Sequence, residues 1–229
     1  GGLHVSAVQK DPKTYEHIKP EDVGNTRNIV ISDQSGKSNI ISRLKTINID
    51  IEENDPKIKK LLNEVKDREF IGYSYDGADA SFELLARRII GEIPRYISIT
   101  EYDVSVKKNS LGEIISSAKA NLEVDGEKII CEGEGNGPVN ALDNAIRQNV
   151  DRLAKYSEYL KDLKLVDYKV RILNTGTEAV TRVSIESTDS KGKNWFTIGV
   201  STNIIDASFK ALIDSLDYKL FKDNAPASI

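Results

Sequence analysis

The 229-residue sequence contains no methionine, a single cysteine and only two histidines. Because Cys131 has no second cysteine to pair with, an intramolecular disulfide is impossible, and we expect a reducing cytoplasm. So few Cys and His side chains also argue against a self-contained zinc site, and we predict no metal site in this chain. The missing methionine leaves no native start residue, so we expect the chain to be a fragment of a longer protein.

Long apolar runs and an excess of positive charge are also absent. No run approaches the roughly 18 apolar residues that a membrane span needs, and the N-terminus does not resemble a signal peptide. The net charge is −4, with Lys and Arg interspersed among Asp and Glu, so we expect neither a nucleic-acid partner nor a membrane. Hydrophobic residues make up 39% of the chain, which is enough for a buried core.

The first part of the chain changes character near residue 55. Residues 1–55 are rich in turn and extended signals, with one short apolar run at 28–31 that could form a strand. Asp55 is a candidate helix cap, and Pro56 suits the first helical turn. A helix over 56–68 is predicted by the apolar spacing of Ile58, Leu61, Leu62 and Val65.

A second helix is predicted from Asp79 to Ile90, and Pro94 ends the helical pattern. Asp76 and Asp79 could suggest a metal site, but spaced carboxylates in a turn more often start a helix. We therefore predict three parts, which are a linker segment over 1–55, a small helical linker subdomain over 56–94 and a third domain over 95–229.

The third domain contains an internal repeat with a constant offset of 66 residues. The alternating segment 102–106 matches the segment 168–172. Further matched pairs are Gly126 and Gly192, Gly133 and Gly199, Gly137 and Asn203, Ala141 and Ala207, and Ala145 and Ala211. Each copy reads as strand, strand, turn, strand, helix. The predicted fold class is therefore α+β, with a duplicated βββα domain after a small helical linker.

The two predicted helices of the repeat begin at matched positions. Gly137 precedes Pro138, which suits the first helical position. Asn203 can cap the second helix, and Asp206 could complete a capping-box-like pair. Apolar stripes at 139, 142, 146 and 150, and at 205, 209, 212 and 216, give each helix one buried face. We expect the two units to pair about a pseudo-twofold axis and to bury their sheet faces together.

Several segments resemble the citramalate and 2-isopropylmalate synthase family. They are Gly2–Val8, Thr14–Ile18, Ser32–Asn39, Gly72–Leu85, Val180–Val183 and Gly199–Ser208. Segment 32–39 fits the citramalate branch, because it lacks the Gly-Lys-His-Ser-Gly pattern of the isopropylmalate branch. The resemblance covers nearly the whole chain. It implies the C-terminal linker and regulatory part of such an enzyme, without the catalytic barrel.

The resemblance implies a parent acyltransferase of isoleucine biosynthesis. Such an enzyme condenses pyruvate with acetyl-CoA to give (R)-citramalate, with a divalent metal in its barrel and no cofactor in this part. His4 is then a catalytic candidate for acid/base chemistry, which suits an imidazole, and Tyr15 is a weaker one. We expect the chain alone to have no synthase activity.

The resemblance also implies an allosteric site for isoleucine. Leu165, Tyr168 and Ile172 map onto the strand that lines the family's effector pocket. Helix starts offer free N–H groups and the positive end of the helix dipole to a carboxylate. The predicted effector-binding residues are Leu165, Tyr168 and Ile172 with the two matched helix starts, Gly135, Asn136 and Gly137, and Ser201, Thr202 and Asn203.

Two other interpretations stay open on the sequence alone. The domain could belong to a 2-isopropylmalate synthase and sense leucine. It could also be a dimerisation module without a ligand, in which the candidate residues only cap helices and pack a sheet. A homodimer is expected in each case, since a duplicated β unit with an apolar face suits one.

Overall fold

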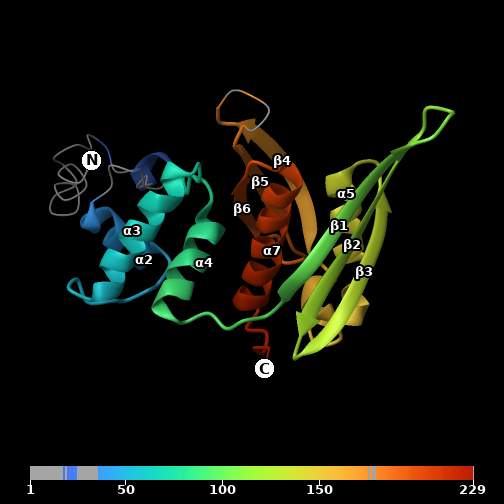
Figure 1. Ribbon diagram of the computed structural model, residues 1–229. Helices are drawn as coiled ribbons and strands as arrows, with labels where there is room; N and C mark the ends of the chain where they lie inside the picture. The colour runs from blue at the N-terminus through green and yellow to red at the C-terminus, as the bar shows by residue number, and fades with distance from the viewer. Residues whose placement is uncertain (1–17, 19, 25–35, 175, 177–178, 229) are drawn as a thin grey trace.

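The computed structural model describes residues 18, 20–24, 36–174, 176 and 179–228 (Figure 1). A 3-10 helix, η2 (Pro20–Val23), precedes three helices, α2 (Lys37–Thr46), α3 (Pro56–Phe70) and α4 (Asp79–Ile90). The remainder, in chain order, is β1 (Ser98–Lys108), β2 (Ile114–Val124), β3 (Glu127–Gly135), α5 (Pro138–Arg147), η3 (Val150–Leu153), α6 (Ser157–Leu160), β4 (Lys164–Ile172), β5 (Thr181–Thr188), β6 (Asn194–Ser201) and α7 (Ile204–Lys222).

Both predicted linker helices are confirmed. An Asp55 side-chain oxygen accepts a hydrogen bond from the N–H of Lys57 at 2.8 Å, so Asp55 caps α3. Pro56 occupies the first helical position, where its missing N–H costs nothing. Helix α4 begins at Asp79 and ends before Gly91, whose φ of 85° is a left-handed helix terminator.

Helix α2 was not predicted from the turn-rich composition of residues 1–55. Its apolar residues Ile40, Ile41 and Leu44 are buried and pack in one cluster with residues of α3 and α4. Gly36 provides no side-chain cap, so the usual signal for a helix start is missing. The strand suggested at 28–31 lies outside the described residues.

The duplicated βββα arrangement is confirmed. Sheet A has the order β1-β2-β3 and sheet B the order β4-β5-β6, both antiparallel. A bulge interrupts the β1–β2 pairing at Thr100, and another interrupts the β4–β5 pairing at Val166, one repeat offset later. Asp125 and Gly126 have φ values of 53° and 77°, as the predicted primed hairpin turn requires.

The helices lie between the two sheets. Helix α5 covers one face of sheet A, α7 covers one face of sheet B, and the two helices pack against each other (Figure 1). The expected burial of one sheet face on the other is therefore wrong, because each sheet buries its inner face on its own helix. Phe209, Leu216 and Leu220 of α7 nevertheless join the core of the first unit, so the two units share apolar residues.

Small residues set the short distance between each helix and its sheet. A Cβ added to Gly199 would lie 1.9 Å from the carbonyl oxygen of Ala207, and one added to Gly133 would lie 2.4 Å from the N atom of Ala145. No real Cβ approaches other atoms so closely. The matched glycines and alanines of the repeat therefore bring α5 and α7 close to their sheets.

The two helices differ in length. Helix α5 ends at Arg147, so Val150 does not extend its apolar stripe as predicted but begins η3, where it is still buried. Helix α7 runs to Lys222. The difference follows from position in the chain, because the segment after α5 must turn back through η3 and α6 to begin β4.

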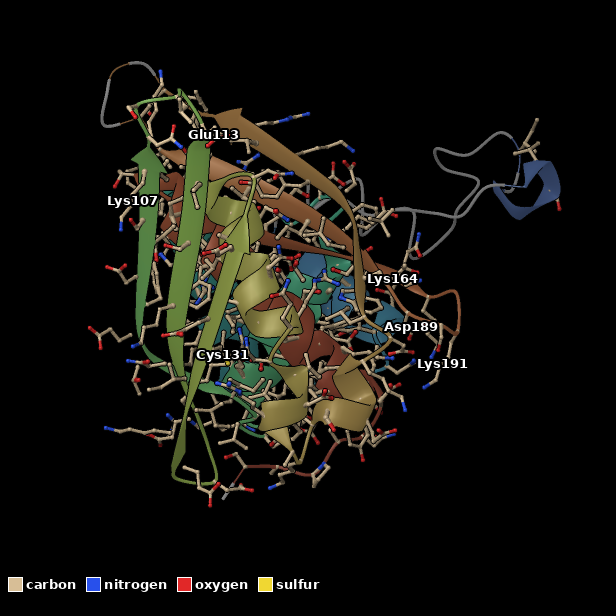
Figure 2. All side chains as sticks on the ribbon, turned by 90° about the vertical axis from the view of Figure 1, so that its right-hand side faces the viewer. Lys107, Glu113, Cys131, Lys164, Asp189 and Lys191 are labelled. Carbon is tan, nitrogen blue, oxygen red and sulfur yellow. The ribbon has the colours of Figure 1, made fainter. Side chains whose placement is uncertain are left out.

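A buried ammonium group ties the last turns of α7 to the β5–β6 hairpin. Lys219 is 2% exposed, and its Nζ lies 2.9 Å from Asp189, 2.8 Å from Asp223 and 3.3 Å from Asp162. Three carboxylates thus surround one buried cation, as burial of a charge requires. Figure 2 shows that Asp189 lies near Lys164, the first residue of β4.

Candidate effector site

Strand β4 presents three predicted effector residues on one face. Leu165 pairs with Ser187 and Tyr168 pairs with Ile185, and both partners point to the buried face of β5. Two residues three positions apart, such as Leu165 and Tyr168, normally point to opposite faces of a strand. The bulge at Val166 shifts this alternation by one residue, so Leu165 and Tyr168 both face α7.

Tyr168 connects this strand to α7. Its hydroxyl lies 2.8 Å from Ser208 Oγ, and Ser208 donates its own proton to the carbonyl oxygen of Ile204 at 2.6 Å. Tyr168 therefore donates the hydrogen bond to Ser208. Burial raises the pKa of the Tyr168 phenol, which keeps the group a neutral donor. Sequence reasoning missed Ser208, which lies one turn into a helix and matches the apolar Leu142 in the first unit.

The far end of the same strand face is uncovered. Ile172 is 71% exposed, Val170 is 39% exposed and Ile204, at the start of α7, is 42% exposed. Ile172 pairs with Thr181, which pairs with Ser201, so Ile172 and Ser201 lie in one row across sheet B. The structure thus brings Tyr168 and Ile172 to the half of the β4 face beside the start of α7. Leu165 lies at the other end of the strand, where its pairing partner Ser187 contacts Ser215 in the second half of α7.

The start of α7 satisfies part of its own backbone. The Asn203 side chain accepts hydrogen bonds from the N–H groups of Ile205 at 2.8 Å and Asp206 at 3.4 Å, which confirms the predicted cap. The suggested capping-box role of Asp206 is wrong. The N–H of Asn203 donates to Ser201 Oγ instead, and the Asp206 carboxylate lies 2.7 Å from Lys210 Nζ. Thr202 is exposed.

The start of α5 has no side-chain cap. Asn140 accepts a hydrogen bond from the N–H of Asn136 at 3.2 Å, and Gly137 occupies the cap position in an extended conformation. A Cβ on Gly135 would lie 2.5 Å from Asn140 Oδ1 and 2.6 Å from the N atom of Ala141. Gly135 therefore allows α5 to pack closely against the end of β3, because α5 fills the space that a side chain would occupy. The uncapped N–H groups of its first turn remain the feature suited to an anion.

Helices α5 and α7 both begin at the upper end of the molecule in Figure 1. They pack side by side, so the two predicted helix starts share one end of the fold. Three surface hollows lie elsewhere and are lined by other residues. One, of about 490 Å³, lies among α4, β1 and α7, with Arg88, Tyr102 and Phe209 in its wall. The other two lie on the outer faces of sheet A and sheet B.

Helix α4 is joined to α7 by a polar contact that sequence reasoning missed. The Arg88 guanidinium lies 2.9 Å from Asp214 and 2.8 Å from Asp217. Ser81 accepts a hydrogen bond from the N–H of Ile198 at 3.0 Å, which satisfies one backbone donor of the edge strand β6. These contacts connect the helical linker to the duplicated unit. Local sequence patterns could not reveal them, because the contacting residues lie more than 100 positions apart.

The catalytic candidates His4 and Tyr15 lie outside the described residues. Among the residues that the structure describes, no group of three or more His, Cys, Asp or Glu side chains could hold a metal ion. Over the same part of the chain, no helix is long and apolar enough to cross a membrane.

Residues 76–220 match the family described as the LeuA allosteric (dimerisation) domain. The chain belongs to this family. Residues 1–70 match a second family, the homocitrate synthase post-HMGL domain-like family. The LeuA allosteric domain match covers β1 to β6, α4, α5 and most of α7, and it begins in the turn between α3 and α4.

The chain is similar to curated synthases of two kinds. It is 45% identical to the (R)-citramalate synthase of Geobacter sulfurreducens and 46% identical to that of Aquifex aeolicus, over 97% of the chain and 42% of each relative. It is 28% identical to a probable 2-isopropylmalate synthase of Methanopyrus kandleri, over 93% of the chain and 40% of that relative. The chain thus spans about two fifths of the length of these relatives.

Proposed function

We propose that this chain is the regulatory part of an (R)-citramalate synthase and that it binds isoleucine as a feedback inhibitor. The allosteric family description supports a regulatory role, and the identities of 45% and 46% to (R)-citramalate synthases support the branch. Isoleucine is the branched-chain amino acid at the end of the pathway that the family resemblance implies. The parent reaction, condensation of pyruvate with acetyl-CoA, belongs to the same proposal, as do the roles of His4 and Tyr15 within it.

The observation that carries the proposal is the uncovered end of the β4 face. Ile172 is exposed on the face where Leu165 and Tyr168 are covered by α7. Burying an apolar side chain there removes apolar surface from water, which stabilises the complex by about 25 cal/mol for each Å² of buried apolar surface. A branched aliphatic side chain is apolar and small enough to cover this exposed end of the β4 face. The uncapped start of α5 can then accept the effector carboxylate, because helix N-termini attract anions.

Isothermal titration calorimetry with isoleucine, leucine and valine tests this proposal directly. We expect isoleucine to bind at least about tenfold more tightly than valine, since one extra methylene in an apolar pocket contributes about 1–3 kcal/mol. Preferential binding of leucine would instead favour the 2-isopropylmalate synthase interpretation. A folded chain that releases no heat with any of the three amino acids would contradict effector binding.

A homodimer is part of the same proposal. The family description includes dimerisation, and exposed apolar side chains gather at the end of the fold where the helices begin. They are Val106, Leu111 and Ile114 on the β1–β2 hairpin, Val170 and Ile172 on β4, and Leu173 directly after β4. A second copy would cover them. Sedimentation analysis should give a dimer. A dimer without any thermal shift from branched-chain amino acids would favour the ligand-free dimerisation module.

We assign the transmission of the signal to α4 and α7. Tyr168 contacts the first turns of α7, and Arg88 of α4 contacts its second half through Asp214 and Asp217. One rigid helix thus connects the strand that would hold the effector to the linker. A coupling of about 1–3 kcal/mol between two arrangements of this contact would change activity several-fold to a hundredfold.

A further inference from the structure

Two arginines face each other directly on the outer face of sheet B. Arg171 of β4 pairs with Arg182 of β5, and both side chains point away from α7. Lys169 lies two positions earlier on the same face of β4. Like charges directly opposite on neighbouring strands are destabilising. An anion between the two side chains would offset this repulsion.

The described part of the chain provides no direct carboxylate partner for this pair. Arg182 uses Nε to donate to the carbonyl oxygen of Gly72 at 2.6 Å, which leaves its two terminal nitrogens for another acceptor. No carboxylate of the described residues forms an ion pair with Arg171 or Arg182. Burial, and then the charge of Arg171, lower the pKa of Arg182, and the charge of Glu69 opposes them. Among the described residues, Lys169 forms an ion pair with Asp167 at 2.5 Å.

These cations line a hollow of about 290 Å³ between sheet B and the turn that joins α3 to α4. Hydroxyl groups of Ser74 and Ser184 lie in the same wall. The lining holds three cationic side chains, of Lys169, Arg171 and Arg182, against one carboxylate, that of Asp76. The hollow therefore combines excess positive charge with neutral hydrogen-bond donors.

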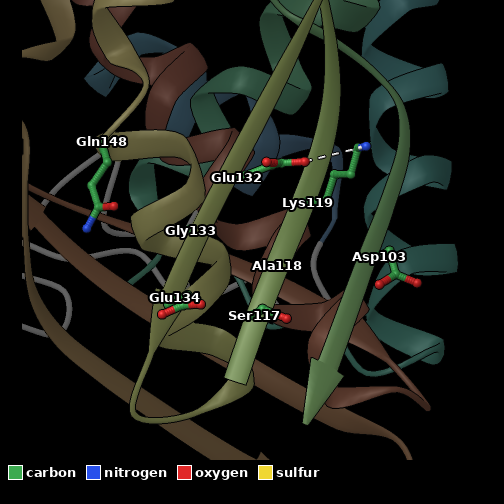
Figure 3. Close-up of a pocket in the computed structure, with 8 residues that line it drawn as sticks. All are labelled: Asp103, Ser117, Ala118, Lys119, Glu132, Gly133, Glu134 and Gln148. Atoms are coloured by element: carbon green, nitrogen blue, oxygen red, sulfur yellow. Dashed lines mark ion pairs between the residues drawn. The ribbon is translucent and has the colours of Figure 1, made fainter. Parts of the chain in front are cut away.

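The repeat provides an internal comparison. One offset earlier, Ser105 occupies the place of Arg171, and it pairs with Ser117 on β2. The hollow on the outer face of sheet A measures about 520 Å³ and is lined by three carboxylates, of Asp103, Glu132 and Glu134, against the ammonium of Lys119 (Figure 3). Lys119 Nζ lies 3.5 Å from Glu132. The same architecture is thus built without an arginine pair, so the pair is not a requirement of the fold.

We propose that the hollow between Arg171, Arg182 and Ser74 binds a phosphate group, either free or as the monoester of a small metabolite. Planar guanidinium groups bind the oxygens of phosphate in a bidentate way, with charge-assisted hydrogen bonds. Two such groups in the lining of one hollow suit a tetrahedral dianion better than a planar monoanionic carboxylate. The serine hydroxyls supply further donors. The site lies on the opposite face of sheet B from the proposed isoleucine site, so the two proposals are independent.

The position of the site gives the anion a structural consequence. Gly72, Ser74 and Asp76 belong to the turn between α3 and α4, whereas Arg171 and Arg182 belong to sheet B. A bound phosphate would hold this turn of the linker against the duplicated unit. The phosphate would thereby stabilise one position of the linker turn relative to the duplicated unit. Any ligand that binds one state better than another shifts the equilibrium in this way.

The test uses thermal unfolding and calorimetry of the whole chain with inorganic phosphate and with adenosine monophosphate, at an ionic strength balanced with sodium chloride. We expect both compounds to raise the unfolding midpoint and sodium chloride alone to leave it unchanged. Tighter binding of the monoester than of inorganic phosphate would identify a metabolite as the source. Similar affinities would identify free phosphate.

Variants separate binding from structure. Arg171→Gln removes an exposed side chain, so we expect the chain to fold with an unfolding midpoint at or above that of the wild type, since a repulsion is relieved. Its phosphate affinity should fall at least about tenfold. Lys119→Gln, on the outer face of sheet A, should leave the phosphate response unchanged. The proposal is overturned if phosphate acts no differently from chloride, or if Arg171→Gln responds to phosphate as the wild type does.

Discussion

The Tyr168 hydroxyl lies 2.8 Å from Ser208 Oγ and joins the edge strand β4 to the first turns of α7. Ser208 donates a hydrogen bond to the carbonyl oxygen of Ile204, so the contact continues to the first residue of the helix. A ligand that displaces the ring of Tyr168 would therefore strain or break its contact with the start of α7. The second half of that helix contacts Arg88 of the linker through Asp217.

A double-mutant cycle measures this contact. Tyr168→Phe and Ser208→Ala should each lower the free energy of unfolding by about 1 kcal/mol, the usual net contribution of one hydrogen bond. The double variant should cost less than the sum of the two, because both changes remove the same bond. Urea unfolding of the four chains gives the coupling energy. Strict additivity would show that the two hydroxyl groups do not interact in solution.

Ile172 offers a test of the effector site with little structural cost. Because its side chain is 71% exposed, Ile172→Ser should change the free energy of unfolding by less than about 0.5 kcal/mol. If the side chain lines the isoleucine site, the affinity should fall about tenfold, as expected for a lost apolar contact.

The matched control for this experiment is Val106→Ser. Val106 occupies the equivalent position one repeat earlier and is 55% exposed. We expect isoleucine binding by calorimetry to be unchanged in this variant. An equal loss in both variants would mean that the two positions act through assembly of the dimer, and not through one ligand pocket.

The close approach of α7 to sheet B predicts a severe effect of one added methyl group. Gly199→Ala would place its Cβ 1.9 Å from the carbonyl oxygen of Ala207, so the helix must shift. We expect a loss of about 3 kcal/mol or more in the free energy of unfolding, as for overpacked cores. Gly137→Ala, with no atom within 4 Å of its added Cβ, should cost at most about 1 kcal/mol. Similar costs in the two variants would contradict the described packing.

The contact between α4 and α7 should be sensitive to pH. Burial raises the pKa of Asp217 from 3.8 to about 7, with Asp214 adding to the shift and Arg88 opposing it. The folded chain then holds a proton between pH 4 and 7 that the unfolded chain has released. The free energy of unfolding should therefore fall as the pH rises through this window, by at most about 1.4 kcal/mol per pH unit.

Asp217→Asn should abolish this dependence. The three carboxylates around Lys219, of Asp162, Asp189 and Asp223, have pKa values below the usual 3.8. The stability that they contribute is lost only as the pH falls below that value. Their effect and that of Asp217 thus occupy different pH windows. Urea unfolding at pH 5, 6, 7 and 8 separates them. A wild-type slope that persists in Asp217→Asn would assign the dependence to another group.

The parts of the fold that follow from local patterns could be predicted. Asp55 and Pro56 start α3 because a carboxylate cap and a proline at the first position act within one turn. The repeat could be detected because each unit needs the same glycine and alanine pairs, such as Gly199 and Ala207, to bring its helix close to its sheet. These signals depend on nearby residues in the chain.

Other features depend on contacts that are distant in sequence. Helix α2 has no cap and is held by apolar contacts with α3 and α4. The bulge at Val166 decides which face Leu165 occupies, and it leaves no mark in the composition of β4. The pairing of Arg171 with Arg182 depends on strand register. The packing role of Gly135 could not be predicted either, because it depends on the contact of α5 with the end of β3.

A branched-chain amino acid bound between the inner face of β4 and the helix starts should slow the exchange of the backbone amides around it. Hydrogen exchange, measured with and without saturating isoleucine, reports this protection residue by residue. We expect slower exchange in 165–172 and in the first turns of α5 and α7, with little change on the outer strand β3. Unchanged exchange in 165–172, with protection confined to other elements, would show that isoleucine does not bind at this face.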